Sequence, residues 1–311
     1  MRTFRATGRE VRGVDIKASP FTDAVGSITD RSFVRDAMAG VSAVIHTATL
    51  HKPHVATHAN RDFVETNITG TLNLLEEATA TGVRCFIFTS TTSTFGSAMR
   101  PQAGQPAAWV TEDVVPVARN IYGVTKLAAE SLCELFARQH RLPSIVLRTS
   151  RFFPEADDDA GIRGTYRTEN AQANELLYRR IDIADVVSAH LAALDQAQVI
   201  GFGRFIVSAT TPFSKSDLPM LHANAAAVVD RLFPECAALY DERGWKLFPT
   251  IDRVYVNRRA VEALEWRPRH DFAHVLDCLR NGNDFRSGLA REVGSKGYHD
   301  VEFDEGPYPV A

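Results

Sequence analysis

Tyr122 and Lys126 are the residues of this sequence whose types and spacing most directly suggest chemistry. Because they are four residues apart, they would lie on one face of a helix and could act on the same atom. A phenol with an ordinary pKa of about 10 is a poor base at neutral pH, but a neighbouring ammonium group favours the phenolate. The pair therefore predicts a general base for a hydroxyl proton, although it is a weak signal without structural context.

Two predicted elements supply that context. Residues 84–91 form an apolar, β-rich run that ends in hydroxyl residues, which indicates a buried parallel strand. Residues 121–137 follow after a loop and carry apolar side chains at helical spacing. The hydroxyl groups at the end of the strand and the Tyr–Lys pair on the helix would meet at the edge where open α/β sheets bind ligands.

As far as about residue 150, the whole chain alternates between strand and helix. This order is typical of an α/β fold with a doubly wound parallel sheet. The predicted strands are 11–15, 42–48, 84–91 and 144–150, and the predicted helices lie near 31–39, 58–81 and 122–140.

After Ser150 the regular alternation ends. Residues 151–178 are acidic and then polar, and we predict a mobile flap over the site. A strand end and helix at 182–194 and a strand at 203–208 follow, and a smaller mixed α/β region begins at about residue 209. The tail after Gly294 is predicted to be loosely ordered or to pack on a neighbour.

Composition argues against several classes of protein. The formal net charge of the 311 residues is −3, without the clustered basic excess expected of a protein that binds nucleic acid or an anionic membrane. No apolar run approaches the ~20 residues of a membrane span, and the N-terminus lacks a signal-peptide core, so we expect a cytoplasmic protein. The four cysteines show no C-x-x-C spacing and are predicted to be buried, reduced thiols.

Four histidines raise the alternative of a transition-metal site. His46, His51, His54 and His58 follow one another at short intervals, and the last two would share a helix face. The segment also contains a lysine and a proline typical of a loop, and no acidic or cysteine ligand completes the set. We therefore predict that the protein holds no metal.

Eight segments of the chain match the motif order of one family. They are VRGVD at 11–15, VIHTA at 44–48, NITGTLNLL at 67–75, TSTTSTFG at 89–96, YGVTK at 122–126, LRTS at 147–150, DIAD at 182–185 and LEWRP at 264–268. In these segments the chain resembles the extended short-chain dehydrogenase/reductase superfamily (NAD-dependent epimerase/dehydratase family), which contains nucleotide-sugar epimerases, dehydratases and related reductases. Each motif is loose, but their ordered sum is specific.

The resemblance implies a Rossmann-type, dinucleotide-binding domain over residues 1–150. Residues 151–311 would form mainly a substrate-binding region, with 179–208 returning to the Rossmann sheet. The family opens with a strand and a glycine-rich turn that binds pyrophosphate, yet no G-x-x-G-x-x-G or G-x-G-x-x-G occurs here. We expect that roughly 15–20 residues lie upstream of Met1 and that the present form binds NAD weakly. A catalytically impaired dinucleotide-binding or scaffold relative is the alternative.

The chemistry implied by the resemblance is hydride transfer to NAD. Tyr122, assisted by Lys126, would remove a hydroxyl proton while hydride leaves the same carbon, and Thr91 would orient that oxygen. Ser90 and Thr92 adjoin Thr91 and are alternatives to it. An epimerase and a dehydrogenase/reductase of a nucleotide sugar both fit, whereas dehydration is disfavoured because Thr92 and Ser93 replace the Asp-Glu pair of dehydratases.

Cofactor binding is expected along the ends of the strands. Asp15 would accept hydrogen bonds from the adenosine ribose and repel a 2′-phosphate, which favours NAD over NADP. Asn67 would tie strand ends together through its amide, and Asp30 would cap the next helix. The predicted cofactor-binding residues are Asp15, Ser27, Ile28, His46, Thr47, Ala48, Asn67, Thr89, Tyr122, Lys126 and Thr149.

Thr92 and Arg151 are the candidate substrate-binding residues. Arg151 stands where many sugar epimerases have an asparagine near the glycosyl diphosphate, and arginine suits a phosphate or carboxylate. It could equally pair with the carboxylates of 155–159. Asp185 is expected to cap a helix rather than touch substrate. The two long helices at 58–81 and 122–140 imply a homodimer.

Overall fold

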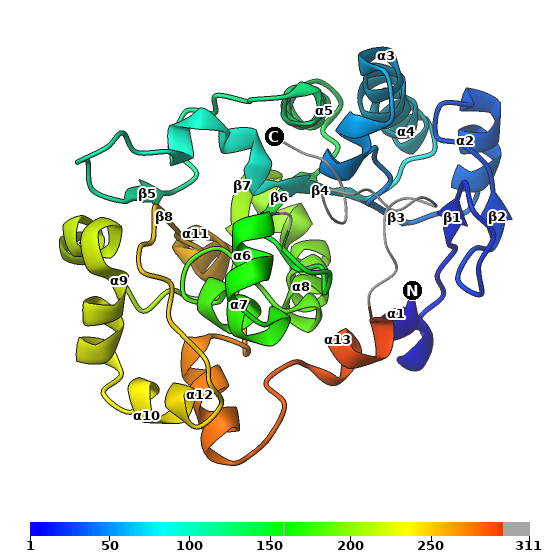
Figure 1. Cartoon of the computed structure of the whole chain (residues 1–311). Coiled ribbons are helices and arrows are strands. Elements are labelled where there is room, and N and C mark those ends of the chain that lie inside the picture. Colours follow the sequence, from blue (N-terminus) through cyan, green and yellow to red (C-terminus); the bar gives the residue numbers. More distant parts are fainter. Residues whose placement is uncertain (158, 295–311) are drawn as a thin grey trace. The chain divides into compact units, whose positions relative to one another are not determined.

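The structure is a computed structural model that describes residues 1–157 and 159–294, so the predicted tail after Gly294 lies outside the described residues. Its helices and strands are labelled in Figure 1. Tertiary contacts divide the chain into two compact units, which are described one at a time. Unit 1 consists of Met1–Ser90, Asn120–Leu147 and Ala193–Arg204, and unit 2 of the described residues of Thr91–Arg119, Arg148–Ala192 and Phe205–Ala311. The predicted domain boundary at residue 150 stays a prediction.

A parallel sheet with helices is the framework of unit 1, as the α/β pattern predicts. The sheet has the strand order β3-β4-β6-β7, and the carboxyl ends of the last three strands are grouped with unit 2. β3 and β4 run parallel, with Ala43 opposite Cys85 and His46 opposite Phe88. The bounds of the four strands are Ala43–His46, Cys85–Thr91, Ser144–Thr149 and Phe202–Val207.

Two very short strands form a separate sheet in unit 1. β1 (Val14–Asp15) runs parallel to β2 (Ala24–Val25), with Asp15 opposite Val25. β1 is shorter than the strand predicted at 11–15, and β2 is absent from the sequence interpretation. A short helix, α1 (Arg2–Ala6), lies near the N-terminus.

Helix α2 (Arg31–Met38) begins as predicted, because the carboxylate of Asp30 accepts hydrogen bonds from the backbone N–H groups of Ser32 and Phe33. The helix predicted at 58–81 is divided into α3 (Asn60–Phe63), a π-helical segment (Val64–Thr69) and α4 (Gly70–Ala80). A π-helical turn inside an α-helix is rare and is frequently found at functional sites. This turn contains Asn67, one of the predicted site residues.

Helix α5 (Ile121–His140) is present where the sequence predicts a helix. Cys133 and Phe136 of its apolar pattern are buried together with Ala129 in a core that includes side chains of β4, α2 and α4, whereas Leu127 and Leu135 are only half-buried. The core of unit 1 joins these helices to one face of the sheet. Its central side chains are Val34, Met38, Leu75, Ala78, Phe86, Phe88, Cys133 and Val146.

Unit 2 contains more helix after residue 150 than the sequence predicts. The segment interpreted as a flap includes α6 (Ala160–Thr165) and α7 (Thr168–Glu175). α8 (Ile183–Ile200) and β7, each of which is divided between the two units, confirm the helix and strand predicted at 182–194 and 203–208. The other elements are β5 (Ala108–Val110), α9 (Leu218–Leu232), α10 (Cys236–Asp241), β8 (Arg253–Tyr255), α11 (Arg258–Ala263), α12 (Phe272–Arg280) and α13 (Gly288–Val293), with 3-10 turns at Thr92–Phe95, Ser97–Met99 and Lys215–Asp217.

Two sequence predictions on single residues have different outcomes. The prediction that Asp185 caps α8 is wrong, because Asp182 accepts the hydrogen bond from Ala184 N–H. Asp185 lies within the first turn, where its carboxylate accepts from the backbone N–H groups of Arg269 and His270. The cysteine prediction is confirmed, since all four thiols are free and buried.

Candidate active site

Tyr122 lies in the first turn of α5, and the start of this helix is fixed locally. The side chain of Asn120 accepts a hydrogen bond from Gly123 N–H at 3.0 Å, which caps the helix. The Tyr122 side chain is 2% exposed, and its ring centre is 5.1 Å from that of His51. The predicted base is therefore a buried phenol in a fixed turn.

Lys126 follows one helical turn later and is also buried. Its Nζ donates a hydrogen bond of 2.7 Å to the carbonyl oxygen of Thr89 and lies 4.1 Å from the centre of the Phe88 ring. Burial lowers the pKa of Lys126 to about 7, although Glu130 and Cys133 act in the opposite direction. Lys126 can therefore exchange a proton near neutral pH, which the sequence did not indicate.

Glu130 is a third polar residue on this face of α5, and the sequence analysis missed it. Its Oε1 accepts a hydrogen bond of 2.6 Å from Ser90 Oγ, and its Oε2 is 3.3 Å from Nε of Arg204. The recurrence of polar residues at 122, 126 and 130 was the available signal. Because Ser90 donates to this carboxylate, its hydroxyl proton is already engaged.

Thr91 and Thr92 lie where β4 ends and a 3-10 turn begins, in unit 2. Both are buried, and Thr91 Oγ1 accepts a hydrogen bond of 3.0 Å from Ser93 N–H, which orients the hydroxyl group. The roles predicted for Thr91 in catalysis and for Thr92 in substrate binding stay predictions.

Asn67 connects the chain after β3 to helix α5. Its Oδ1 accepts hydrogen bonds from Leu50 N–H at 2.8 Å and Thr49 Oγ1 at 2.9 Å, and its Nδ2 donates to Leu50 O and Thr125 Oγ1. Asn67 does form side-chain hydrogen bonds between elements, but its partners lie in the loop after β3 and on α5 rather than at two strand ends, so the prediction that it ties strand ends together holds only for its hydrogen-bonding role. Its binding of cofactor stays a prediction.

The four closely spaced histidines are used in different ways. His46 is buried and its Nε2 lies 2.9 Å from Thr71 Oγ1, while burial lowers its pKa to about 3, assisted by Lys126. The rings of His54 and His58 are in edge contact at 5.2 Å. Among residues 1–157 and 159–294, no three His, Cys, Asp or Glu side chains are arranged to hold a metal ion.

Several of the predicted cofactor-binding residues have exposed positions at strand ends. Asp15 is exposed at the end of β1, and its Oδ1 accepts only a local hydrogen bond from Lys17 N–H among the interactions of the described chain. Thr47 and Ala48 are exposed directly after β3. An open carboxylate and small, accessible residues fit a ribose and a dinucleotide backbone. The sequence has no glycine-rich turn for the pyrophosphate.

The other residues predicted to bind cofactor are less accessible. Ser27 Oγ lies 2.8 Å from Thr29 Oγ1, and Ile28 is buried beneath Gly70, where an added Cβ would meet the Ile28 side chain at 2.5 Å. Thr149 is buried at the end of β6. Contacts of these three residues with a cofactor stay predictions.

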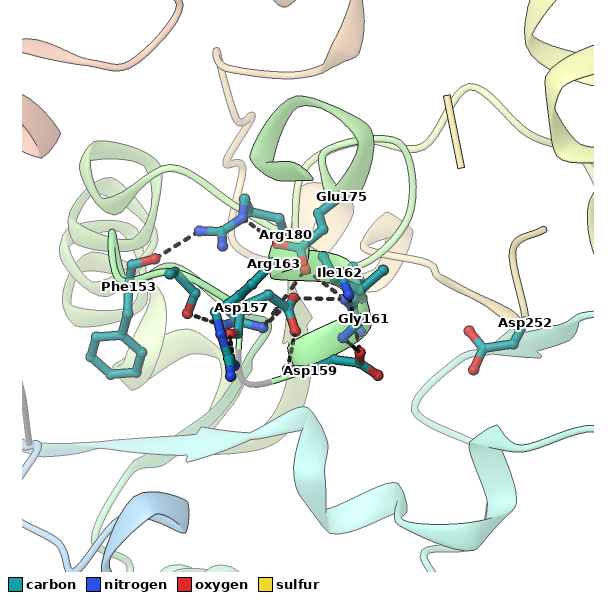
Figure 2. A network of polar contacts seen from close by, with 12 residues as sticks. Phe153, Asp157, Asp159, Gly161, Ile162, Arg163, Glu175, Arg180 and Asp252 are labelled. Carbon is teal, nitrogen blue, oxygen red and sulfur yellow. Dashed lines mark hydrogen bonds and ion pairs between the residues drawn. The ribbon is translucent and has the colours of Figure 1, made fainter. Parts of the chain in front are cut away.

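Arg151 belongs to a network of ion pairs in unit 2. Figure 2 shows this network around Asp157, Glu175 and Arg180. Its Nη1 is 2.8 Å from Asp157 Oδ2 and 3.7 Å from Glu175 Oε1. Arg179 and Arg180 each approach Glu175 at 2.6 Å. The alternative interpretation, that Arg151 pairs with a carboxylate of 155–159, is therefore confirmed, and a substrate contact of Arg151 stays a prediction.

None of the helices in the described part of the chain combines the length and apolar character that crossing a membrane requires.

Comparisons with known proteins agree with this arrangement. A family model described as "NAD dependent epimerase/dehydratase family" matches residues 1–207. UDP-glucose 4-epimerase of Erwinia amylovora is 32% identical over 155 residues, which cover 49% of this chain and 43% of that protein. GDP-6-deoxy-D-mannose reductase of Pseudomonas aeruginosa is 30% identical over 149 residues, which cover 43% of this chain and 47% of that protein. The chain thus matches less than half the length of these curated relatives.

Among solved structures, a short-chain dehydrogenase/reductase superfamily protein from Agrobacterium tumefaciens with bound NAD has a TM-score of 0.62. It is 24% identical, and the match covers 94% of each chain. UDP-glucose 4-epimerase from Thermotoga maritima, solved with UDP-glucose, has a TM-score of 0.58 at 20% identity, over 90% of this chain and 94% of that chain. These similarities confirm the predicted Rossmann-type α/β fold.

Proposed function

Because the chain belongs to the NAD dependent epimerase/dehydratase family, we propose that it is an NAD-linked epimerase or dehydrogenase/reductase that acts on a hydroxyl-bearing carbon of a nucleotide sugar. The observation that supports this proposal most is the buried face of α5. Tyr122 and Lys126 lie one helical turn apart there, and Lys126 is held by a carbonyl oxygen near the end of β4. Perturbed ionisable groups at strand ends are typical of active sites.

The residues of the chain have distinct roles in this proposal. Tyr122, as phenolate, takes the proton of the substrate hydroxyl and becomes a neutral phenol. In its charged form, Lys126 stabilises the phenolate of Tyr122. Because its pKa is lowered to about 7, its ammonium group can also release a proton near neutral pH. Thr91 is the proposed hydroxyl residue that orients the substrate oxygen. NAD, when bound, supplies the acceptor for the hydride that leaves the same carbon.

Binding of NAD is proposed along the strand ends of unit 1. Asp15 is the proposed ligand of the adenosine ribose, and the exposed Thr47 and Ala48 are proposed to line the dinucleotide. The weak point is the pyrophosphate, since the sequence contains no glycine-rich turn. The second candidate function is a catalytically impaired dinucleotide-binding or scaffold relative, which the binding measurement below distinguishes from an active enzyme.

Titration calorimetry with NAD, followed by a screen of nucleotide sugars for NADH formation or for a new epimer, tests the proposal. We expect heat of binding with NAD and less with NADP, because Asp15 would repel the 2′-phosphate. Asp15→Asn should narrow the difference between the two dinucleotides, while Asp36→Asn, an exposed change on α2, should leave it unchanged. No binding of either dinucleotide would exclude the proposed function for this chain.

Cytoplasmic location and a homodimer belong to the same proposal. The exposed Val64 and Val124, on the two helical segments implied as the dimer interface, support a contact between copies. A monomer in light scattering would contradict it.

A further inference from the structure

His51 lies beside the proposed base but has no part in the proposed reaction. It follows β3 and immediately precedes the 3-10 turn Lys52–Ala56. Its ring centre is 5.1 Å from that of Tyr122, and the two ring planes are inclined by 45°. At this separation the two rings are in direct van der Waals contact, as in other tilted aromatic pairs. The position of one ring therefore restricts the position of the other.

The backbone around His51 is anchored on both sides. On one side, Leu50 exchanges two hydrogen bonds with the side chain of Asn67, at 2.8 and 3.1 Å. On the other side, the N–H of His51 itself donates to Nδ1 of His54 at 2.8 Å. These bonds hold the backbone that carries the imidazole, so His51 is a fixed neighbour of the phenol.

The same anchor reaches the backbone of Tyr122. Asn67 Nδ2 donates to Thr125 Oγ1 at 3.0 Å, and the hydroxyl group of Thr125 is shared between the carbonyl oxygens of Ile121 at 2.9 Å and Tyr122 at 3.1 Å. Backbone and ring of Tyr122 are thus connected to one continuous set of contacts through Thr125, Asn67, Leu50 and His51. A set of packed and hydrogen-bonded side chains of this kind is what holds a reactive group in its productive orientation.

Lys126 is held by different partners. Its Nζ is bound by Thr89 O and lies over the ring of Phe88. A change at His51 removes neither of these two partners of the ammonium group, whereas it removes a ring that contacts the phenol. Since the attraction between an ammonium and a phenolate falls with distance, the acidity of Tyr122 should depend on how its ring is held.

The charge state of His51 suits a purely positional role. Burial lowers the pKa of His51 to about 3, and the groups Lys126, His54 and Lys52 around it act in the same direction. The imidazole is therefore neutral at and around neutral pH. It contributes shape beside the phenol without adding a second positive charge.

We propose that His51 is a positioning residue for Tyr122: its ring, fixed through Asn67 and His54, keeps the phenol close to Lys126. This inference rests on the proposed function, because the orientation of the phenol matters to turnover only if Tyr122 is the base. It gives a role to one of the four closely spaced histidines, which in the described residues do not form a metal site.

The test uses the full chain labelled with carbon-13 at the tyrosine Cζ, with Tyr122→Phe to assign the Tyr122 signal. In His51→Ala, we expect the titration midpoint of the Tyr122 phenol to rise by about one pH unit, because the ring moves away from Lys126. In His51→Phe, which keeps a ring of similar shape, the midpoint should return to that of the wild type. His140→Ala, which removes an exposed imidazole at the far end of α5, is the matched control and should not change it.

The titration midpoints of the variants support or overturn the positioning role of His51. An unchanged midpoint in His51→Ala, or equal shifts in His51→Ala and His51→Phe, would overturn the inference. If His51→Ala does not fold, His54→Phe removes the acceptor of the His51 N–H and should raise the midpoint by a smaller amount. The carbon-13 titration needs neither NAD nor substrate. Failure of the proposed function would instead be seen in the calorimetry with NAD, so the two failures can be distinguished.

Once a substrate is found, His51→Ala should lower kcat about tenfold or more with little change in KM, as expected when the orientation of a reacting group is lost. A change confined to KM would contradict positioning.

Discussion

The α5 face of unit 1 and the arginine–carboxylate network of unit 2 both bury charged groups, but they stabilise them differently. In the network, Glu175 is 1% exposed and lies 2.6 Å from both Arg179 and Arg180, while Asp157 pairs with Arg151 at 2.8 Å. On the α5 face, the ammonium of Lys126 is held by a carbonyl oxygen and an aromatic ring, neither of which carries a full charge.

The pKa values follow from this difference. Burial raises the pKa of Glu175, but its neighbouring arginines outweigh burial and hold that pKa well below its ordinary value. Burial lowers the pKa of Lys126 to about 7, and the opposing effect of Glu130 does not compensate. A buried charge that is paired keeps its charge and supports structure, whereas one without a full counter-charge can change its protonation state and do chemistry.

Replacement of Tyr122 by phenylalanine is expected to have the largest effect. Tyr122→Phe removes only the hydroxyl group, so turnover should fall about 10²–10⁴-fold while the free energy of unfolding changes little. Steady-state kinetics and chemical denaturation of the same preparation measure both. Tyr166→Phe, a half-buried tyrosine of unit 2, is the control and should keep full turnover. If Tyr122→Phe turned over substrate at the wild-type rate, Tyr122 would not be the general base.

Removal of the central carboxylate should show the structural character of the network. Glu175→Gln removes the buried carboxylate that pairs with Arg180 and leaves Arg179 with Asp157 as its carboxylate partner, and we expect a loss of about 3–5 kcal/mol in the free energy of unfolding. Glu262→Gln, at the exposed pair with Arg258 on α11, should cost less than about 0.5 kcal/mol. Equal costs for the two variants, measured by urea denaturation, would mean that the unit 2 network does not stabilise the fold.

The pH dependence of stability tests the α5 face. The pKa of Lys126 falls from 10.5 to about 7 on folding, so between these values the unfolded chain binds more protons than the folded chain. Stability from this group therefore rises with pH across that window. Relative to the wild type, Lys126→Met should lose about 2 kcal/mol of this rise between pH 7 and pH 9.

The loss of the hydrogen bond to Thr89 in Lys126→Met adds a cost that does not depend on pH, so the slope is the quantity to compare. Parallel stability curves for the two proteins would show that Lys126 is already paired like the carboxylates of unit 2.

Local patterns in the sequence predicted the regular elements well. The strands at 84–91 and 144–150, the helix at 122–140 and the Asp30 cap are all present, because each depends on neighbours in the sequence. The strands β2, β5 and β8 could not be predicted in the same way. They are two or three residues long. β5 and β8 pair with each other across a long stretch of sequence, with Ala108 opposite Arg253, and β2 pairs with the equally short β1, with Ala24 opposite Val14.

The sequence predicted less well those side chains whose hydrogen-bond partners lie far away in the sequence. The sequence identified Asn67 as a residue that ties elements together, but its partner Thr125 is 58 residues away and the π-helical turn around it has no local pattern. The prediction that Asp185 caps α8 was wrong because its carboxylate accepts hydrogen bonds from the backbone N–H groups of Arg269 and His270, which are more than 80 residues away in the sequence.

The sequence by itself determined that Tyr122 and Lys126 share a helix face, because the period of the α-helix places residues four apart side by side. Only the tertiary structure decided what surrounds them. It placed Thr89 and Phe88 at the ammonium and His51 at the phenol, and it gave Arg151 two carboxylate partners. The physical reason is that the acidity of a buried group depends on every charge and dipole that folding brings within a few ångströms of it.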